Sequence, residues 1–264
     1  MNFSTDNIFD ISTKPNYTVL AEIYDEVMHD VDYEAWTDYI DEIIMQHHHK
    51  AEDLLELACG TGTMALSIEE FGYYNILATD ASQQMIEIAR KKAEKEYSDV
   101  EFKTMNFLDF DIDRKFDIVY MVFDSLNYLH NDDDILKLHQ NVREVLNPGG
   151  LFIYDFTTPR NSINAISYLD KKEQKVGNTI RYRRDSKYDH KDRLHTNTFK
   201  IEKLSPQTGE LVQSFTEVHR QRIYTLEEIT DLVNQTDFDI IAAYDGFKLI
   251  PARKNSLRIT MVLK

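Results

Sequence analysis

Cysteine is almost absent from this chain of 264 residues, which holds a single one, Cys59. One cysteine excludes an internal disulfide and is typical of a reducing compartment. No run reaches the roughly 18 consecutive apolar residues that a membrane span needs. The leading segment, MNFSTDNIFDISTKPNY, lacks the basic stretch and apolar core of a secretory signal. We therefore expect a cytoplasmic protein with no membrane segment.

Positive charge is also scarce, because 30 Lys and Arg face 46 Asp and Glu, for a formal net charge of −16. This balance disfavours nucleic-acid binding, which depends on basic side chains that neutralise phosphates. Residues 171–200 are the exception, with ten Lys and Arg against four Asp and Glu. Any contact with RNA would have to use this segment.

Strand-like and helix-like segments alternate over the first 156 residues. Apolar strand candidates lie at 53–58, 75–80, 100–105, 116–123 and 150–156. Helical spacing of apolar residues occurs at 17–29, 33–46, 63–71, 82–96 and 132–146. NPGG at 147–150 is a helix-stop and turn signal before the next strand. Short alternating units predict a parallel, doubly wound sheet.

The pattern changes after residue 156. Residues 179–224 resemble long antiparallel strands joined at the turn signal SPQTG, and Thr225 with Glu228 forms a capping box for a helix at 225–236. Two last strands are predicted at 239–245 and 256–264. The predicted fold is α/β, a doubly wound Rossmann-like sheet of seven mostly parallel strands with an antiparallel β insertion. We expect an N-terminal helical lid at 1–50, a core at 51–158 and 225–264, and an insertion at 159–224.

The stretch DLLELACGTG, residues 53–62, places Gly60 and Gly62 in a tight strand-to-helix turn. Extended to Ala65, it fits the dinucleotide pattern G-x-G-x-x-A. A pyrophosphate would seek bare N–H groups there, whereas the cationic S-adenosylmethionine is favoured by nearby carboxylates such as Glu56. Asp80, at the end of the next strand, can hold ribose hydroxyls of either ligand. A second mononucleotide half is not apparent after residue 123, which favours the cationic ligand.

Five elements in register carry a family resemblance: ELACGTG, LATDAS followed by Met85, MNF at 105–107, FDIVYMVFDSLNYL and NPGG. Together they resemble a class I S-adenosylmethionine-dependent methyltransferase. The flanking segments YDEVM, YEAW and EVHRQRIYTLEEI are similar to glycine N-methyltransferase, the aminosugar N-methyltransferases and uncharacterised bacterial relatives. The resemblance implies S-adenosyl-L-methionine as cofactor and S-adenosyl-L-homocysteine as product.

The same resemblance implies cofactor-binding roles at named positions. The backbone at Ala58, Gly60 and Gly62 is implied to cradle the cofactor, and Asp80 is implied to hold the ribose. The other implied contacts are Tyr24 and Trp36 over the methionine portion, Glu56 near its end, Asn106 and Phe107 around adenine, and Ala81, Met85, Phe123, Asp124 and Ser125 nearby.

One position departs from the family pattern. The glycine-methylating relatives have an arginine shortly after the tryptophan, which grips a carboxylate. Here Trp36 is followed by Thr37, Asp38, Tyr39 and Ile40. The resemblance therefore leaves the recognition of a carboxylate open.

An amine acceptor must be neutral when it attacks, so a proton acceptor is sought near the site. The candidates are Asp124, Tyr128 and His219, of which Tyr128 matches the place of a histidine in several N-methyltransferase relatives. Cys59 is interpreted as a small buried side chain. The run His47–His49 is interpreted as a solvated helix end, because adjacent residues cannot converge from one helix face, and no metal site is expected.

Strand alternation sorts the insertion's polar residues by face. Glu217, His219 and Gln221 share one face of their strand, and Arg220, Arg222 and Tyr224 share the other. In the strand TIRYRRDSKY, Arg181 and Arg183 lie on one face and Arg184 on the other. One face of this insertion is expected to look into the site.

The favoured function is methyl transfer to an amine or hydroxyl of a small molecule by in-line displacement. Two alternatives are an RNA methyltransferase, with residues 171–200 facing phosphates, and a non-catalytic protein that binds S-adenosylmethionine. Nucleic acid is the less favoured partner, no membrane partner is expected, and a homodimer is left open. The acceptor itself is not identified by the sequence.

Overall fold

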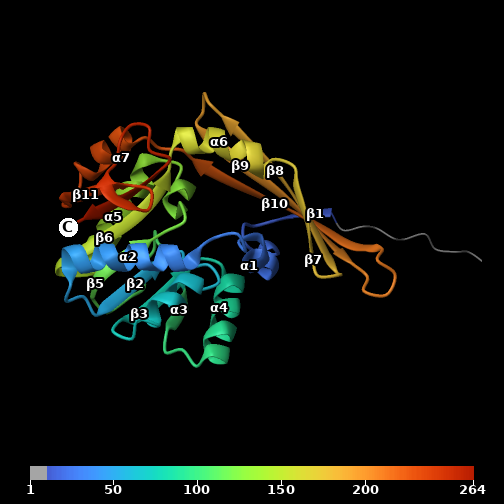
Figure 1. Ribbon diagram of the computed structural model, residues 1–264, viewed down its shortest axis with the longest axis horizontal. Helices are drawn as coiled ribbons and strands as arrows, with labels where there is room; N and C mark the ends of the chain where they lie inside the picture. The colour runs from blue at the N-terminus through green and yellow to red at the C-terminus, as the bar shows by residue number, and fades with distance from the viewer. Residues whose placement is uncertain (1–10) are drawn as a thin grey trace, which may run out of the picture.

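The computed structural model describes residues 11–264 and contains two β-sheets (Figure 1). The first ten residues, part of the leading segment and of the expected lid, lie outside the described residues. The larger sheet has the order β12-β11-β13-β6-β5-β2-β3-β4. Its strands are β2 (Asp53–Leu57), β3 (Asn75–Asp80), β4 (Glu101–Thr104), β5 (Phe116–Met121), β6 (Leu146–Thr157), β11 (Ile240–Asp245), β12 (Lys248–Pro251) and β13 (Arg258–Leu263).

Strands β2 to β6 are mutually parallel, and β13 and β11 continue the sheet antiparallel. This arrangement confirms the predicted doubly wound α/β class. The sheet has one strand more than the seven predicted, because β12 folds back on β11 through a turn at Gly246 and Phe247. Gly246 has φ +63°, and glycine is common at the first position of a two-residue hairpin turn.

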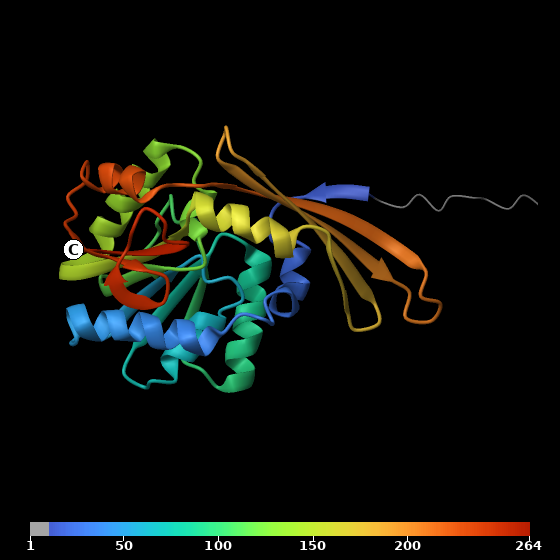
Figure 2. The ribbon, with the colours of Figure 1, turned by 45° about the horizontal axis from the view of Figure 1, so that its top comes forward.

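Helices cover both faces of this sheet. On one face α2 (Tyr33–His48), α3 (Thr63–Glu69) and α4 (Gln83–Glu96) pack against residues such as Leu54 and Ile118. On the other, α5 (Asp132–Val145) and α7 (Leu226–Val233) pack against Leu55 and Val119. Side chains of successive strand residues thus pack against the helices on opposite faces, as expected for a sheet buried on both sides. Figure 2 shows α2 lying across one face.

The second sheet has the order β1-β10-β9-β8-β7 and extends away from the body of the molecule in both ribbon views (Figures 1 and 2). Its strands are β1 (Ile11–Lys14), β7 (Lys172–Val176), β8 (Ile180–Asp189), β9 (Leu194–Leu204) and β10 (Leu211–Arg222). The long antiparallel strands of 179–224 are therefore as predicted. Strand β1 was not predicted, and it pairs parallel with β10 over a separation of about 200 residues.

The expected helix at 17–29 is wrong in extent. It is a 3₁₀ turn, η1 (Leu20–Ile23), followed by one α-helical turn, α1 (Tyr24–Val27). The preceding backbone instead donates to a distant side chain, because the Glu217 carboxylate accepts the N–H groups of Tyr17, Val19 and Leu20 at 2.5–2.9 Å. The apolar residues of this N-terminal segment, Val19, Leu20 and Ile23, pack against the second sheet.

Two features near residue 150 differ from expectation. The turn signal NPGG lies within β6, where the pairing jumps from Leu146 to Leu151 so that 147–150 bulge out of register. The insertion begins with a helix that was not predicted, α6 (Pro159–Leu169). Thr158 caps it and Pro159 occupies its first turn, which is a helix-start signal that the sequence does contain. The predicted capping box of Thr225 and Glu228 is present on α7.

Candidate active site

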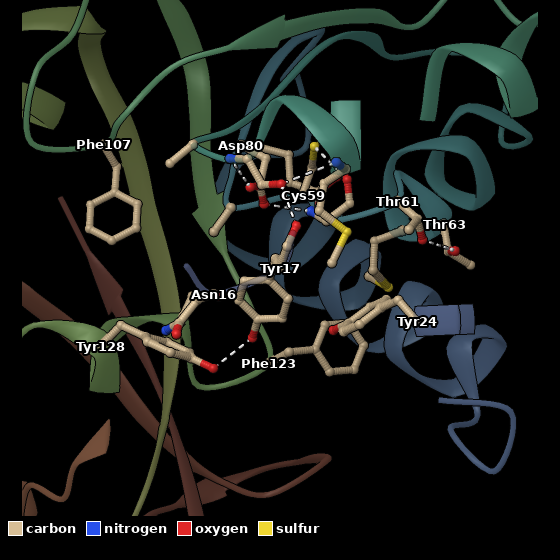
Figure 3. A pocket seen from close by; sticks show the side chains of 18 of the residues that line it. Asn16, Tyr17, Tyr24, Cys59, Thr61, Thr63, Asp80, Phe107, Phe123 and Tyr128 are labelled. Carbon is tan, nitrogen blue, oxygen red and sulfur yellow. Dashed lines mark hydrogen bonds between the residues drawn. The ribbon is translucent and has the colours of Figure 1, made fainter. Parts of the chain in front are cut away.

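A cavity of about 290 Å³ opens where β2, β3 and β5 end (Figure 3). Carboxyl ends of parallel strands are where open α/β sheets bind ligands. The residues that line it include most positions predicted to hold the cofactor: Tyr24, Glu56, Ala58, Gly60, Asp80, Ala81, Met85, Asn106, Phe107, Phe123 and Ser125. The structure also adds residues that the sequence did not single out: Asn16, Tyr17, Thr61, Thr63, Met64 and Ser82.

The glycine loop forms one wall of this cavity and is bent by left-handed residues. Ala58 has φ +54° and Gly60 has φ +56°. Asp80 holds the loop, because its carboxylate accepts the N–H groups of Gly60 at 2.9 Å and Ser82 at 2.8 Å. Burial raises the pKa of Asp80, and these two hydrogen bonds oppose the rise. Asp80 therefore fixes the loop geometry and presents a carboxylate to the cavity.

Gly62 is used differently from Gly60. It precedes α3 with φ +79°, and it does not line the cavity. A Cβ at this position would lie 2.6 Å from the Phe102 ring and 3.0 Å from the Ala89 side chain. Gly62 thus permits close packing of the loop on α4 and β4, and its predicted contact with the cofactor stays a prediction.

Glu56 lies at the end of β2 with 2% of its surface exposed. Its carboxylate accepts one side-chain hydrogen bond, from the Tyr120 hydroxyl at 3.0 Å. Burial raises its pKa from an ordinary value of 4.5 to about 8. A buried carboxylate with no basic partner favours a positively charged ligand beside it.

Aromatic side chains from the N-terminal segment cover the cavity. Tyr17, Tyr24 and Tyr33 line it, and the rings of Tyr17 and Tyr24 meet edge to face at 5.8 Å. The segment is fastened to the glycine loop, because the Thr61 hydroxyl donates to Asp25 at 2.5 Å and Lys92 contacts Asp25 at 2.8 Å. These contacts hold the N-terminal segment over the glycine loop.

The charge of the lining separates the two ligands that the sequence left open. Two carboxylates, Glu56 and Asp80, line the cavity, and no Lys, Arg or His from residues 11–264 does so. A pyrophosphate would face the carboxyl groups of Asp80 and Glu56, with no Lys, Arg or His among the lining residues to compensate its charge. A ligand with a sulfonium and an ammonium group fits both the carboxylates and the aromatic rings. The residues present thus fit S-adenosylmethionine.

Comparisons with known proteins agree with this geometry. A family described as a methyltransferase domain matches residues 54–150. A solved S-adenosylmethionine-dependent methyltransferase from Clostridium acetobutylicum superposes with a TM-score of 0.76 and 27% identity, over 94% of this chain and 98% of that one. The chain is a class I S-adenosylmethionine-dependent methyltransferase.

Other relatives of this methyltransferase include both curated proteins and solved structures. The Bacillus subtilis protein YqeM, whose name describes it as a methyltransferase, is 25% identical to this chain. The match covers 85% of this chain and 87% of YqeM. Streptomyces venezuelae DesVI has the same fold, with a TM-score of 0.70 and 19% identity over 92% of this chain and 97% of that one. The matches to several other curated relatives span 34–56% of their length.

A second cavity of about 700 Å³ adjoins the first in the methyltransferase. The two share Tyr17, Tyr24, Phe123 and Tyr128 in their walls. The second is enclosed by α2, α6 and the inner face of the second sheet, which supplies Arg184, His195, Asn197, Phe199, His219 and Gln221. The face that looks into the site is therefore the one that carries Glu217, His219 and Gln221.

A chain of hydrogen bonds runs along the wall between the cavities. The hydroxyls of Tyr17 and Tyr128 are 2.6 Å apart, and Tyr128 Oη lies 3.0 Å from His219 Nδ1 (Figure 3 shows the tyrosine pair). His219 Nε2 faces Glu217 Oε2 at 3.4 Å. Burial raises the pKa of Glu217, but His219 and the backbone N–H groups of Leu20 and Val19 together lower it by more. The pKa of Glu217 therefore lies below its ordinary value. Glu217 thus places a carboxylate beside His219 Nε2, which forms no hydrogen bond with the described residues.

Two side chains hold the Asp124 carboxylate. Arg258 Nη2 contacts Asp124 Oδ1 at 2.5 Å, and Gln221 Nε2 donates to Asp124 Oδ2 at 2.5 Å. Arg258 also donates to the fully buried Asp155, and burial raises the pKa of Asp155 to about 6. Phe123 and Asp124 both have left-handed φ, of +61° and +51°. Such backbone strain at a strand end is typical of functional sites.

Trp36 lies in the second cavity and does not line the first. Its ring packs on Phe123 at 4.7 Å and Phe247 at 4.6 Å, and the Arg258 guanidinium lies 5.5 Å from it. The contact of Trp36 with the methionine portion therefore stays a prediction, and the aromatic residues of the N-terminal segment that line the first cavity are Tyr17, Tyr24 and Tyr33. Cys59 is 8% exposed, and burial raises its pKa well above the ordinary value, as expected for an unreactive thiol.

Proposed function

We propose that this methyltransferase transfers a methyl group to the amine of a small molecule held in the second cavity. The observation that carries the proposal is the shared wall, which places Tyr128 and its histidine partner between the two cavities. Aminosugar N-methyltransferases support the choice of an amine: a Streptomyces venezuelae enzyme named for N,N-dimethylation of a dTDP-aminosugar is 30% identical over 47% of this chain and 50% of its own.

The cofactor residues are assigned by position in the first cavity. Asp80 holds the ribose, and the backbone from Ala58 to Gly60 follows the methionine portion. Glu56 offers its carboxylate to the positive end, while Asn106 and Phe107 flank the base. When bound, S-adenosylmethionine supplies an activated methyl group on a sulfonium. The chain itself supplies alignment and exclusion of water, which can lower a barrier by roughly 7–11 kcal/mol.

Proton removal from the acceptor is assigned to His219 through Tyr128. The Tyr128 hydroxyl lies within hydrogen-bond distance of both the Tyr17 hydroxyl and His219 Nδ1. With Nδ1 of His219 unprotonated, Tyr128 donates to it, so a proton taken from the amine at Tyr128 can pass to the histidine. Glu217 stabilises the resulting imidazolium. Asp124, a predicted catalytic candidate, has both oxygens engaged, so we assign it to positioning of Tyr128's segment and of the acceptor.

An RNA acceptor gains no support from the basic segment. Its outward arginines are paired within the sheet, Arg181 with Glu202 at 2.5 Å and Arg183 with Asp185 at 2.7 Å. Lys200 also contacts Glu202. Cations that are already neutralised contribute little to phosphate binding. No helix among residues 11–264 is long and apolar enough to cross a membrane.

The test is a pair of measurements on the purified protein. Calorimetry with S-adenosylmethionine and S-adenosylhomocysteine measures cofactor binding. Formation of S-adenosylhomocysteine is then followed with matched acceptors, such as aminosugars and the corresponding sugars with a hydroxyl in place of the amine. Turnover with amines and not with their hydroxyl counterparts supports the proposal. Cofactor binding with turnover only on hydroxyl acceptors contradicts it.

A further inference from the structure

Arg184 stands apart from the other charged residues of the second sheet. It lies on the inner face of β8, opposite Phe199 on β9, and lines the second cavity. Its neighbours in sequence, Arg183 and Asp185, point to the outer face and pair with each other. Arg184 forms no ion pair with any of residues 11–264.

The hydrogen bonding of Arg184 is incomplete. Its Nε donates to Asn197 Oδ1 at 3.0 Å, and its guanidinium lies 5.2 Å from the Phe199 ring. Within the described part of the chain its two terminal nitrogens donate to no acceptor. Burial lowers the pKa of this guanidinium, which shows that its charge is poorly solvated. A half-buried cation without an anionic partner is costly unless a ligand compensates it.

The carboxylates nearby do not supply that partner. Asp124 is bound by Arg258 and Gln221, and Asp155 is bound by Arg258. Glu217 is occupied by three backbone N–H groups. Each is therefore satisfied without Arg184, and the terminal guanidinium nitrogens are left for a molecule in the cavity.

We propose that Arg184 binds an anionic oxygen group, a carboxylate or a phosphate, of the methyl acceptor. This inference rests on the proposed function, because it takes the second cavity as the acceptor site. The planar guanidinium can offer two parallel N–H groups to either oxyanion, while Asn197 fixes its orientation. Arg184 is close enough to Tyr128 for its charge to act on the Tyr128 hydroxyl. An acceptor that spans the two residues carries an amine at one end and an anion at the other.

Arg184 on β8 supplies a cation to this cavity, whereas the segment directly after Trp36 contains none. In this chain the positions after Trp36 hold Thr37, Asp38 and Tyr39, and Thr37 and Tyr39 are buried in the core. The only tryptophan of the chain, Trp36, lines the same cavity as Arg184, so its fluorescence reports on occupancy.

The experiment titrates the protein with inorganic phosphate and, separately, with acetate at constant ionic strength. Trp36 fluorescence is recorded with and without saturating S-adenosylhomocysteine. We expect saturable binding of at least one anion, weakened at least tenfold in Arg184→Met and partly retained in Arg184→Lys. The matched control Arg183→Met, on the outer face of the same strand, should bind like the unaltered protein. The stronger of the two anions identifies the group as phosphate or carboxylate.

The outcomes separate this inference from the proposed function. Saturable binding that is equal in Arg184→Met and the unaltered protein overturns it, as does the absence of saturable binding of both anions. Affinity for S-adenosylhomocysteine, measured by calorimetry on the same samples, tests the cofactor site independently. Unfolding midpoints of all variants, followed by circular dichroism, exclude misfolding as the cause of any loss.

Discussion

The two cavities of this methyltransferase are built in different ways. The cofactor cavity is lined mainly by residues that directly follow β2, β3 and β5, within 56–128 of the chain. The acceptor cavity takes its walls from α2, α6, three strands of the second sheet and Arg258 near the C-terminus. The first is acidic and aromatic, whereas the second contains arginine, histidine and amide side chains.

The two cavities also differ in how far apart in the chain their residues lie. The first cavity uses backbone turns and two carboxyl groups that a parallel sheet places at one edge. The second cavity, which we propose as the acceptor site, depends on contacts between distant residues, such as Asp124 with Arg258, which are 134 positions apart. Variants of the first site should therefore change cofactor affinity, and variants of the second should change turnover or stability.

The largest effect is expected for His219→Gln. Removal of the proton acceptor should lower kcat by about 10²–10⁴-fold, which is the usual contribution of a general base. Affinity for S-adenosylmethionine should stay within twofold, because His219 does not line the cofactor cavity. Steady-state kinetics with an active amine and calorimetry check both points. The control His190→Gln lies on an exposed turn; an equal kcat in His219→Gln and this control would contradict the role.

Arg258→Met should lower the free energy of unfolding of the protein. It leaves Asp124 and the buried Asp155 without their shared cation, and breaking such a buried ion pair costs about 3–5 kcal/mol. The free energy of unfolding in urea measures the loss. Arg222→Met breaks an ion pair with the more exposed Asp132 at 3.0 Å, so it should cost no more than about 1 kcal/mol. Equal losses in the two variants would show that Arg258 is not a structural cation.

Asp80→Ala should affect only the cofactor side. Loss of a charged hydrogen-bond partner should weaken cofactor binding by about 100-fold, and Gly60 and Ser82 lose an acceptor for their N–H groups. Calorimetry gives the affinity, and circular dichroism verifies the fold. Asp111→Ala removes an exposed carboxylate that pairs with Lys103 and should bind normally. An unchanged affinity in Asp80→Ala would refute the assignment of this carboxylate.

The raised pKa of Glu56 should make cofactor affinity depend on pH, with a smaller effect than the substitutions above. Burial raises its pKa to about 8, so it is mainly protonated at neutral pH in the free protein. A positive ligand favours the ionised form, so affinity for S-adenosylmethionine should rise, up to tenfold per pH unit, as pH increases toward 8. Ionisation of the buried group costs folding free energy, so the stability of the free protein should fall as pH rises from about 4.5 to 8.

Proton release tests the same carboxyl group directly. Calorimetry in buffers of different ionisation enthalpy should detect up to one proton released when S-adenosylmethionine binds near pH 7. Glu56→Gln should abolish this release and flatten the pH dependence of affinity. The surface variant Glu87→Gln on α4 should behave like the unaltered protein. Proton release that persists in Glu56→Gln would assign the titration to another group.

The glycine loop, Asp80, Glu56 and the parallel strands around them could be predicted from the sequence. Each belongs to a short contiguous segment with its own signal, a glycine turn or a polar residue after an apolar strand. The helix at 17–29 could not be predicted correctly, because its helical spacing competes with a carboxylate about 200 residues away, Glu217. Helix α6 was not predicted, although Thr158 and Pro159 form a helix-start signal in the sequence.

By itself, the sequence determined the α/β class, the glycine cradle and the acidic character of the cofactor site, because these follow from periodicity and from residues close together in the chain. Only the tertiary structure decided which face of β8 and β10 looks inward, that Trp36 lines the second cavity, and that Arg184 forms no ion pair with any of residues 11–264. Strand alternation assigns residues to two faces but not the faces to a side. That choice is made by packing against α6 and the N-terminal segment, which local sequence does not record.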